Sequence, residues 1–103
     1  MFGLIGRITA TPGKREELIA ILASGEGGMP GCLSYIVARD RNDPEVLYVT
    51  EAWESREAHA ASLKLPSVQA AITRGRPLIA RFETIAETEP VGDVGLGSEF
   101  DNP

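Results

Sequence analysis

The chain has 103 residues, which is the length of one domain with a single core and excludes a two-domain organisation. Hydrophobic residues make up 43% and charged residues 24% of it, which is typical of a globular protein and excludes an intrinsically disordered chain. The net charge is −5 and the basic residues are dispersed, so nucleic acid is not an expected partner, because phosphate binding needs a concentrated positive surface.

The first two elements are a strand and a helix. Residues 2–10 carry apolar residues in imperfect alternation before a Thr-Pro-Gly turn, which predicts a strand. A helix follows over 14–23, because apolar residues recur there at helical spacing. Gly25 is placed to end this helix, and a loop containing Gly and Pro continues to residue 31.

A β-hairpin is expected next. Residues 32–39 and 46–53 are rich in β-branched, aromatic and apolar side chains, which predicts two strands. The segment between them, Asp-Arg-Asn-Asp-Pro at 40–44, is typical of a turn. The two strands should therefore be antiparallel neighbours.

Two short helices and a last strand complete the chain. Ser55 stands where an N-cap residue belongs, so a helix begins after it and runs to about Leu65. Pro66 fits the first turn of a further helix, since its missing N–H costs nothing there, and Gly75 ends that helix. Residues 77–85 form the last strand.

The order β-α-β-β-α-β predicts an α+β fold of the ferredoxin-like kind, in which helices cover one face of an antiparallel sheet. Large apolar residues are expected on both faces: Phe2, Leu4, Ile36, Val49 and Phe82. An uncovered face would then expose more apolar surface than a monomer usually shows. We therefore predict a homodimer that packs sheet against sheet.

The predicted domain spans residues 1–88, and residues 89–103 are expected to be a flexible tail. The tail contains Pro90, several glycines and acidic residues, and it lacks an apolar period. Its Gly-Ser-Glu-Phe segment at 97–100 is also consistent with residues added by cloning.

The sequence also indicates where the protein works. Cys32 is the single cysteine, so an intramolecular disulfide is excluded. The N-terminus lacks the basic-then-apolar order of a secretory signal, and no apolar run approaches the roughly 20 residues needed to cross a bilayer. We expect a cytoplasmic protein with no membrane partner.

One His and one Cys are too few for most metal sites, which need several converging ligands. No metal is therefore expected. The same scarcity argues against a Ser–His–Asp or Cys–His hydrolase, and Cys32 is most simply a small buried hydrophobic residue.

The most informative segment holds the only Trp and the only His. Trp53 stands six residues before His59, where a strand leads into a helix. An imidazole titrates near neutrality, so His59 is a candidate proton acceptor; the alternative is an exposed or capped helical His. Trp53 is either the wall of a pocket or a core anchor. Ser62 lies one turn after His59 on the same ridge and is a candidate substrate contact.

Two further residues are candidates for binding a substrate. Tyr35 lies on the expected hairpin and can offer a hydroxyl, although tyrosines on strands commonly pack with only the tip in water. Arg74 can meet an anionic group, although a cation near the end of a helix is also explained by the helix dipole.

Three stretches resemble the antibiotic biosynthesis monooxygenase family: residues 1–13, Met29-Pro-Gly-Cys-Leu-Ser-Tyr35, and Thr50-Glu-Ala-Trp53-Glu-Ser-Arg-Glu-Ala-His59. The resemblance covers nearly the whole of 2–85. It implies a dimeric α+β barrel and, in several members, oxygenation of quinols or phenolic polycyclic compounds without a cofactor. There the deprotonated substrate gives an electron to O₂, so the protein binds, orients and removes a proton.

The resemblance also bears on particular positions. Members that degrade haem resemble a pattern of Asn, Trp and a ligating His at places held here by Gly6, Ser62 and Ile72, which disfavours haem degradation. Quinol-oxidising members often carry a His near Ser62. Members acting on aromatic polyketides can carry a Tyr six residues after the Trp. That is the place of His59, for which the resemblance implies the role of general base or proton relay.

The leading hypothesis is a cofactor-independent monooxygenase whose partners are a small aromatic substrate and O₂. Trp53 would be the aromatic wall and His59 the proton acceptor, with Tyr35, Ser62 and Arg74 as further substrate contacts. One alternative is detoxification of reactive quinones without oxygenation. Another is a non-catalytic dimeric module that binds a small aromatic metabolite, since a fold does not fix a function.

Overall fold

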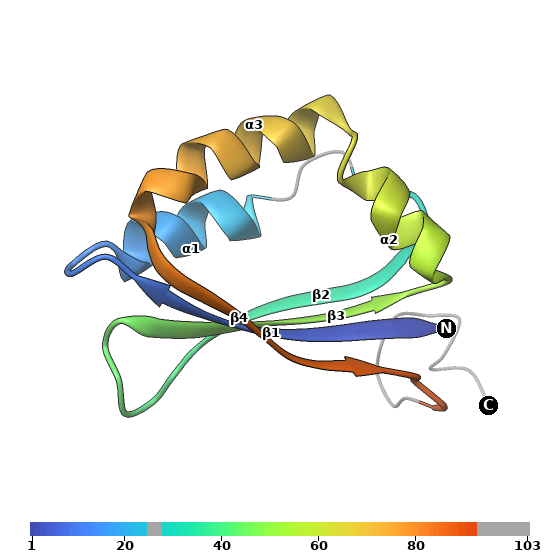
Figure 1. Ribbon diagram of the computed structural model, residues 1–103, viewed down its shortest axis with the longest axis horizontal. Helices are drawn as coiled ribbons and strands as arrows, with labels where there is room; N and C mark the ends of the chain where they lie inside the picture. Colours follow the sequence, from blue (N-terminus) through green and yellow to red (C-terminus); the bar gives the residue numbers. More distant parts are fainter. Residues whose placement is uncertain (25–27, 93–103) are drawn as a thin grey trace.

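A four-stranded antiparallel sheet organises the computed structural model, which describes residues 1–24 and 28–92. The strands lie in the order β2-β3-β1-β4, and their bounds are Phe2–Ala10 (β1), Cys32–Arg39 (β2), Val46–Trp53 (β3) and Ile79–Thr88 (β4). The helices lie together on one face of the sheet (Figure 1), with bounds Arg15–Ala23 (α1), Arg56–Ser62 (α2) and Pro66–Gly75 (α3). The predicted ferredoxin-like α+β fold is confirmed.

The core lies between α1 and the two central strands. Leu18 of α1 is fully buried against Ile8, Leu47 and Val49, which face the helices from β1 and β3. Burying such a side chain completely is worth about 1.5 to 3 kcal/mol. A Cβ at Gly75 would lie 3.3 Å from Leu18 Cδ1, so this glycine lets the end of α3 pack closely on α1.

The predicted starts of α2 and α3 are confirmed, but α2 ends earlier than predicted. The Ser55 hydroxyl accepts a hydrogen bond from the Ala58 N–H at 3.0 Å, and Pro66 occupies the first turn of α3. The prediction that α2 runs to about Leu65 is wrong, because the helix ends at Ser62. Leu65 has an extended backbone with ψ 136°, since the residue before a proline is disfavoured in the helical region.

The bounds of the last strand also differ from the prediction of 77–85. Residues Arg76–Leu78 form a short 3-10 turn, and β4 then continues to Thr88, which pairs with Gly3. The β1–β4 register shifts between Ile5 and Gly6, because Ile5 pairs with Ala86 whereas Gly6 pairs with Thr84. Ile85 is thus an extra residue, a β-bulge that changes which residues of β4 face the helices beyond it.

The register assigns large apolar residues unequally to the two faces. Phe2, Leu4, Val49 and Phe82 lie on the face that the helices cover, whereas Ile36 lies on the other face and is 51% exposed. The homodimer stays a prediction, and its sheet-packing argument now depends mainly on the face that carries Ile36.

Other predictions fall partly outside the described residues. Gly25, which was predicted to end the first helix, and the part of the predicted tail from residue 93 onward lie outside the residues that the structure describes. Of the helices in residues 1–24 and 28–92, none has the length and apolar character needed to cross a membrane.

Candidate functional site

A small cavity of about 40 Å³ lies on the helix-facing side of the sheet. Its lining comes from β1, β3 and β4: Leu4, Ile5, Gly6, Val49, Glu51, Phe82 and Thr84. Among these described residues, Glu51 is the only one with an ionisable side chain. Gly6 leaves space in the cavity, since a Cβ added there would be in contact with the Phe82 ring at 3.5 Å. The cavity is therefore an apolar hollow with one carboxyl group in its wall.

Glu51 connects this cavity to the residues found by sequence. Its Oε1 accepts a hydrogen bond from the Trp53 indole N–H at 2.9 Å and lies 4.0 Å from His59 Nε2. The Glu51 and His59 side chains are 17% and 22% exposed. Glu51 is a candidate site residue that sequence reasoning missed. It could have been found from the alternation of β3, in which Glu51 interrupts a row of buried apolar side chains that ends at Trp53.

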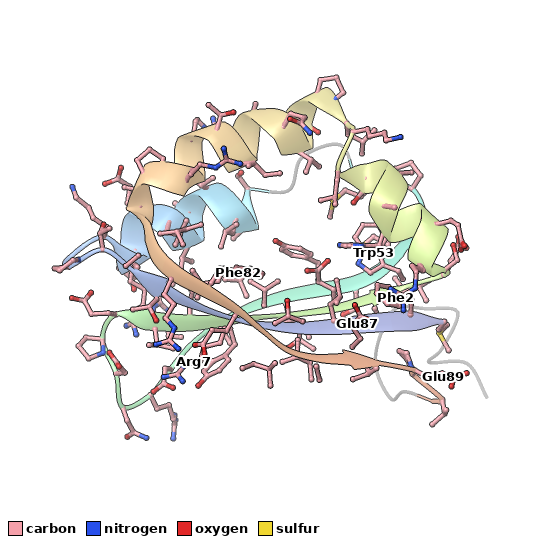
Figure 2. All side chains as sticks on the ribbon, in the orientation of Figure 1. Phe2, Arg7, Trp53, Phe82, Glu87 and Glu89 are labelled. Atoms are coloured by element: carbon pink, nitrogen blue, oxygen red, sulfur yellow. The ribbon has the colours of Figure 1, made fainter. Side chains whose placement is uncertain are left out.

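The rings of Trp53, His59 and Phe2 meet beneath α2. The His59 ring packs edge-on against Trp53 with 5.3 Å between centroids, and it lies 5.7 Å from the Phe2 ring. Trp53 is only 1% exposed, and Figure 2 shows it beside Phe2 under this helix. The predicted neighbourhood of Trp53 and His59 is thus present, with His59 at the border between core and solvent.

Tyr35 lies on the neighbouring strand, directly opposite Glu51 in the β2–β3 register. Burial raises the pKa of Tyr35 to about 12, and the nearby Glu51 and Cys32 add to the rise. Burial likewise raises the pKa of the Cys32 thiol, a backbone hydrogen bond with Ser34 lowers it, and the charge of Glu51 adds to the rise. Tyr35 therefore keeps its proton at neutral pH and offers a hydrogen-bond donor.

The other two predicted contacts, Ser62 and Arg74, do not line the cavity. Ser62 is 4% exposed, and its hydroxyl donates a hydrogen bond to the His59 backbone carbonyl at 2.6 Å, so it is engaged within α2. Arg74 is exposed in the last turn of α3, and Figure 1 shows this end of the helix far from α2. The structure thus brings together Tyr35, Trp53 and His59 around Glu51, and it leaves Arg74 outside this group.

Two contacts fix α2 over the site. Gly31 has φ +83°, and a Cβ there would lie 2.6 Å from Ala58 Cβ, so only glycine permits this approach of the loop to α2. The Arg56 guanidinium lies 4.5 Å from the centre of the Phe2 ring and 3.0 Å from Glu87 Oε1. This ion pair is exposed, so its main contribution is to cover Phe2.

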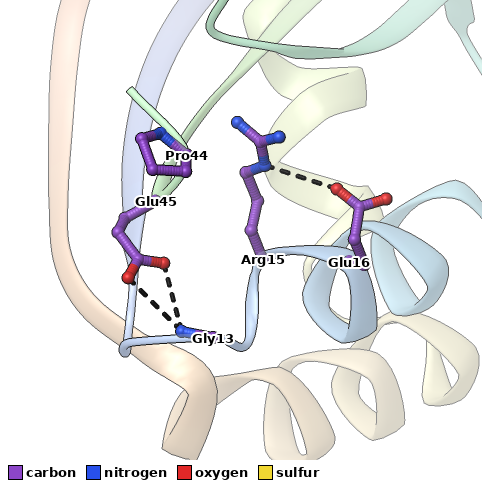
Figure 3. Close-up of a pocket in the computed structure, with 5 residues that line it drawn as sticks. All are labelled: Gly13, Arg15, Glu16, Pro44 and Glu45. Atoms are coloured by element: carbon purple, nitrogen blue, oxygen red, sulfur yellow. Dashed lines mark hydrogen bonds and ion pairs between the residues drawn. The ribbon is translucent and has the colours of Figure 1, made fainter. Parts of the chain in front are cut away.

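A second hollow, of about 250 Å³, lies at the opposite end of the sheet (Figure 3). It is lined by Gly13, Arg15, Glu16, Pro44 and Glu45. Arg15 donates hydrogen bonds to the carbonyls of Asp40, Asp43 and Val46, and the Glu45 carboxylate accepts two from the Gly13 N–H. Its charged groups thus have partners within the protein, so the smaller cavity at Glu51 is the better candidate site.

Metal binding has little basis in the residues that the structure describes. Within residues 1–24 and 28–92, no three His, Cys, Asp or Glu side chains converge as metal ligands would. Glu51 and His59 lie 4.0 Å apart, but two ligands are fewer than protein sites normally use.

Comparison with known proteins identifies the family. Residues 1–74 match the model described as antibiotic biosynthesis monooxygenase. A solved structure of a candidate antibiotic biosynthesis monooxygenase from Chloroflexus aurantiacus is 56% identical, with 93% of this chain and 98% of that chain covered and a TM-score of 0.85.

More distant solved structures support the fold alone. A protein from Pseudomonas aeruginosa is 23% identical, with 88% and 94% of the two chains covered and a TM-score of 0.77. A candidate monooxygenase from Deinococcus radiodurans is 23% identical, with 95% and 100% covered and a TM-score of 0.71. No curated protein matches the chain. The match over residues 1–74 and the close structural relative confirm the resemblance seen in the sequence: the chain belongs to the antibiotic biosynthesis monooxygenase family.

Proposed function

We propose that the protein is a cytoplasmic, cofactor-independent monooxygenase that oxidises a quinol or a phenolic polycyclic compound with O₂. The observation that carries the proposal is the Glu51 carboxyl group in the wall of an apolar cavity, with Trp53 and His59 directly behind it. Membership of a family named for monooxygenases supports the type of reaction. An apolar hollow with few polar groups is the usual form of a site for an aromatic ligand.

The chemistry makes modest demands on the protein. The substrate hydroxyl loses its proton, and the electron pair of the O–H bond stays on the substrate oxygen. The resulting anion gives an electron to O₂. Overall, one oxygen atom enters the substrate in place of two hydrogens, and the other leaves as water with those hydrogens. The protein therefore has to bind, orient and accept a proton.

The residues around Glu51 divide these tasks. His59 supplies the imidazole that accepts the proton, and its Nε2 lies 4.0 Å from Glu51 Oε1. Trp53 is buried behind the cavity lining, packs edge-on against His59 and holds Glu51 through its indole N–H. Tyr35 remains protonated and donates a hydrogen bond to developing negative charge. Ser62 and Arg74 are not part of this arrangement.

Substrate entry requires one wall of the cavity to move. The volume of about 40 Å³ accommodates little more than a water molecule, whereas ligand pockets usually measure about 300 to 1,000 Å³. Phe82 lies on the edge strand β4 and is 60% exposed, so its ring is the lining side chain with the most freedom to rotate outward. A bound aromatic substrate takes the place of this ring.

The homodimer predicted from the sequence is part of the proposal. Two copies would meet through the sheet face that the helices leave uncovered, with the exposed Ile36 at the contact. Such a dimer leaves the helix-facing cavity of each copy free, so each subunit would carry its own site.

Oxygen uptake tests the proposed activity. The wild-type protein is incubated with a panel of hydroquinones and anthrone-type phenols, beside His59→Ala and the control Glu57→Ala, an exposed change on the same helix. We expect uptake by the wild type and the control, and a loss of about 10²- to 10⁴-fold in His59→Ala. Binding of the panel without oxygen uptake would instead support a non-catalytic module. A tight one-to-one haem complex, with loss of its absorption band on reduction, would support the haem branch.

A further inference from the structure

Glu51, and not His59, is the ionisable residue that reaches the cavity. The Glu51 side chain is part of the lining, whereas His59 lies behind it at 4.0 Å. We infer that Glu51 selects substrates by hydrogen bonding, so that the site takes the hydroxyl-bearing form of an aromatic compound and rejects the corresponding ether or carbonyl form. This inference rests on the proposed function, because it specifies the substrate class of the same site.

The hydrogen-bonding state of Glu51 determines what it can recognise. Hydrogen bonds to Glu51 within the described part of the chain involve only Oε1, which accepts from the Trp53 indole N–H. An indole N–H is a donor only, so this contact holds the carboxylate in place as an acceptor. Glu51 lines the cavity, and within the described residues its second oxygen, Oε2, has no hydrogen-bond partner. A carboxylate accepts hydrogen bonds but donates none.

The apolar surroundings of Glu51 strengthen its preference for a hydroxyl group. The rest of the lining is apolar apart from Thr84, so a bound ring finds few other groups to satisfy a polar substituent. A hydroxyl pointing at Glu51 forms a charge-assisted hydrogen bond. A carbonyl or ether oxygen at the same place sets one acceptor against another and leaves both unpaired, which a partly buried site penalises.

The preference of Glu51 for a hydroxyl group also favours release of the product. A quinol or phenol enters with a hydroxyl that matches Glu51, and oxidation converts this hydroxyl into a carbonyl that does not. The product is therefore bound more weakly than the substrate, and its release is favoured. The same preference argues against a role in capturing quinones, because quinones present carbonyls only.

Binding measurements test the inference without any need for turnover. Isothermal titration calorimetry compares 2-naphthol with 2-methoxynaphthalene, which keeps the ring and the oxygen but lacks the hydroxyl proton. The proteins are the wild type, Glu51→Gln and the control Glu57→Gln, which makes the same change of charge at an exposed site on α2. Gly6→Val, which fills the floor of the cavity, shows whether the ligands bind there.

The wild type and Glu57→Gln should bind 2-naphthol about 10- to 100-fold more tightly than the ether, the difference expected for one hydrogen bond to a charged group. In Glu51→Gln the ratio should fall to within about threefold, because an amide both donates and accepts. Gly6→Val should weaken both ligands at least about tenfold, because a side chain there occupies the space of the ring.

Several outcomes would overturn the inference. A wild-type ratio near one, an unchanged ratio in Glu51→Gln, or no binding of either ligand would each do so. The wild-type ratio alone decides the matter if Glu51→Gln fails to fold, as judged by circular dichroism. Oxygen uptake without the binding preference would overturn the inference and leave the proposed function intact, whereas the preference without oxygen uptake would do the reverse.

Discussion

Both ends of the sheet carry charged residues, but these residues have several bonding partners at one end and few at the other. At the first, the Arg15 end (Gly13, Arg15, Glu16, Arg39 and Glu45), ionic groups bond to one another, to backbone carbonyls or to a backbone N–H. The hydrogen bond from Arg39, the largest cause, and its charge hold the pKa of Glu16 down at about 2. At the second, the Glu51 end (Tyr35, Glu51, Trp53 and His59), one carboxyl group faces a cavity with a single close donor.

The comparison shows that the larger hollow is not the better candidate site in this molecule. The hollow at the Arg15 end is the larger, but its charges already have partners and its role is to hold the hairpin against α1. The cavity at the Glu51 end is small, but it combines apolar walls with an ionisable group. Mutations at the Arg15 end should therefore affect stability alone, whereas mutations at the Glu51 end should affect the chemistry as well.

The largest effect on stability is expected from Trp53→Ala. Trp53 is 1% exposed, and its removal leaves a cavity and takes the N–H donor from Glu51. Urea denaturation should show a fall of about 3 to 5 kcal/mol in the free energy of unfolding. Leu63→Ala, at a 43% exposed position on the α2 side, is the control and should change it by less than about 1 kcal/mol. Equal losses in the two variants would show that Trp53 is not an anchor.

A pH effect of about 3 kcal/mol is expected from Tyr35. Its pKa is raised from 10.0 to about 12 in the folded protein, so the folded state holds this proton more tightly than the unfolded chain. The stability due to the neutral side chain is complete below pH 10 and is lost as the pH rises through 12, by about 1.4 kcal/mol per unit.

Denaturation at several pH values, with Tyr35→Phe as the reference, measures this loss. The wild type should lose stability relative to Tyr35→Phe only above pH 10. Parallel curves for the two proteins up to pH 12 would contradict the burial of this hydroxyl.

A loss of about 2 to 3 kcal/mol is expected from Arg15→Ala at the other end of the sheet. The Arg15 side chain is 16% exposed, and its guanidinium donates to three carbonyl groups, which the variant leaves without this partner. Oxygen uptake per folded molecule should stay at the wild-type level. Lys14→Ala, next to it but exposed, serves as the control. A loss of activity in folded Arg15→Ala would break the division between the two ends.

The smallest effect on the fold is expected from Ile36→Glu. The residue is 51% exposed, so the free energy of unfolding of a single chain should change by no more than about 0.5 kcal/mol. The proposed dimer should nevertheless dissociate, because two carboxylates would face each other across the sheets. Light scattering after gel filtration should show the dimer mass for the wild type and the monomer mass for the variant. A monomeric wild type would refute the sheet-packing proposal.

Most of the fold could be predicted from local signals. Helical spacing, the Ser55 cap and Pro66 mark elements through contacts between residues close in sequence, and these were placed correctly. The end of α2 and the bounds of β4 were wrong, because they depend on the extended backbone at Leu65 and on pairing with β1. The register between strands far apart in sequence, such as β1 and β4, and a β-bulge within it cannot be read from one sequence.

The site was predictable only in part for the same reason. Trp53 and His59 lie close in sequence, so a strand followed by a helix was enough to predict their neighbourhood. The alternation of β3 marks Glu51 as unusual, but its place in a cavity is visible only with the sheet complete, because β1 and β4 supply the other walls. Tyr35 reaches it through a register that shifts between Cys32 and Ser34. Arg74 was a candidate by charge alone, and its position in α3 gives it no part.

The bulge at Ile85 makes the length of β4 as important as its composition. Before the bulge Thr84 faces the helices, and after it Glu87 does, although three positions separate them. An insertion or deletion here would exchange inward and outward side chains along the rest of the strand. Glu87 would then turn away from Arg56, and Phe2 would lose part of its cover. Relatives that keep every residue around Glu51 but differ by one residue in this strand would therefore enclose a differently shaped cavity.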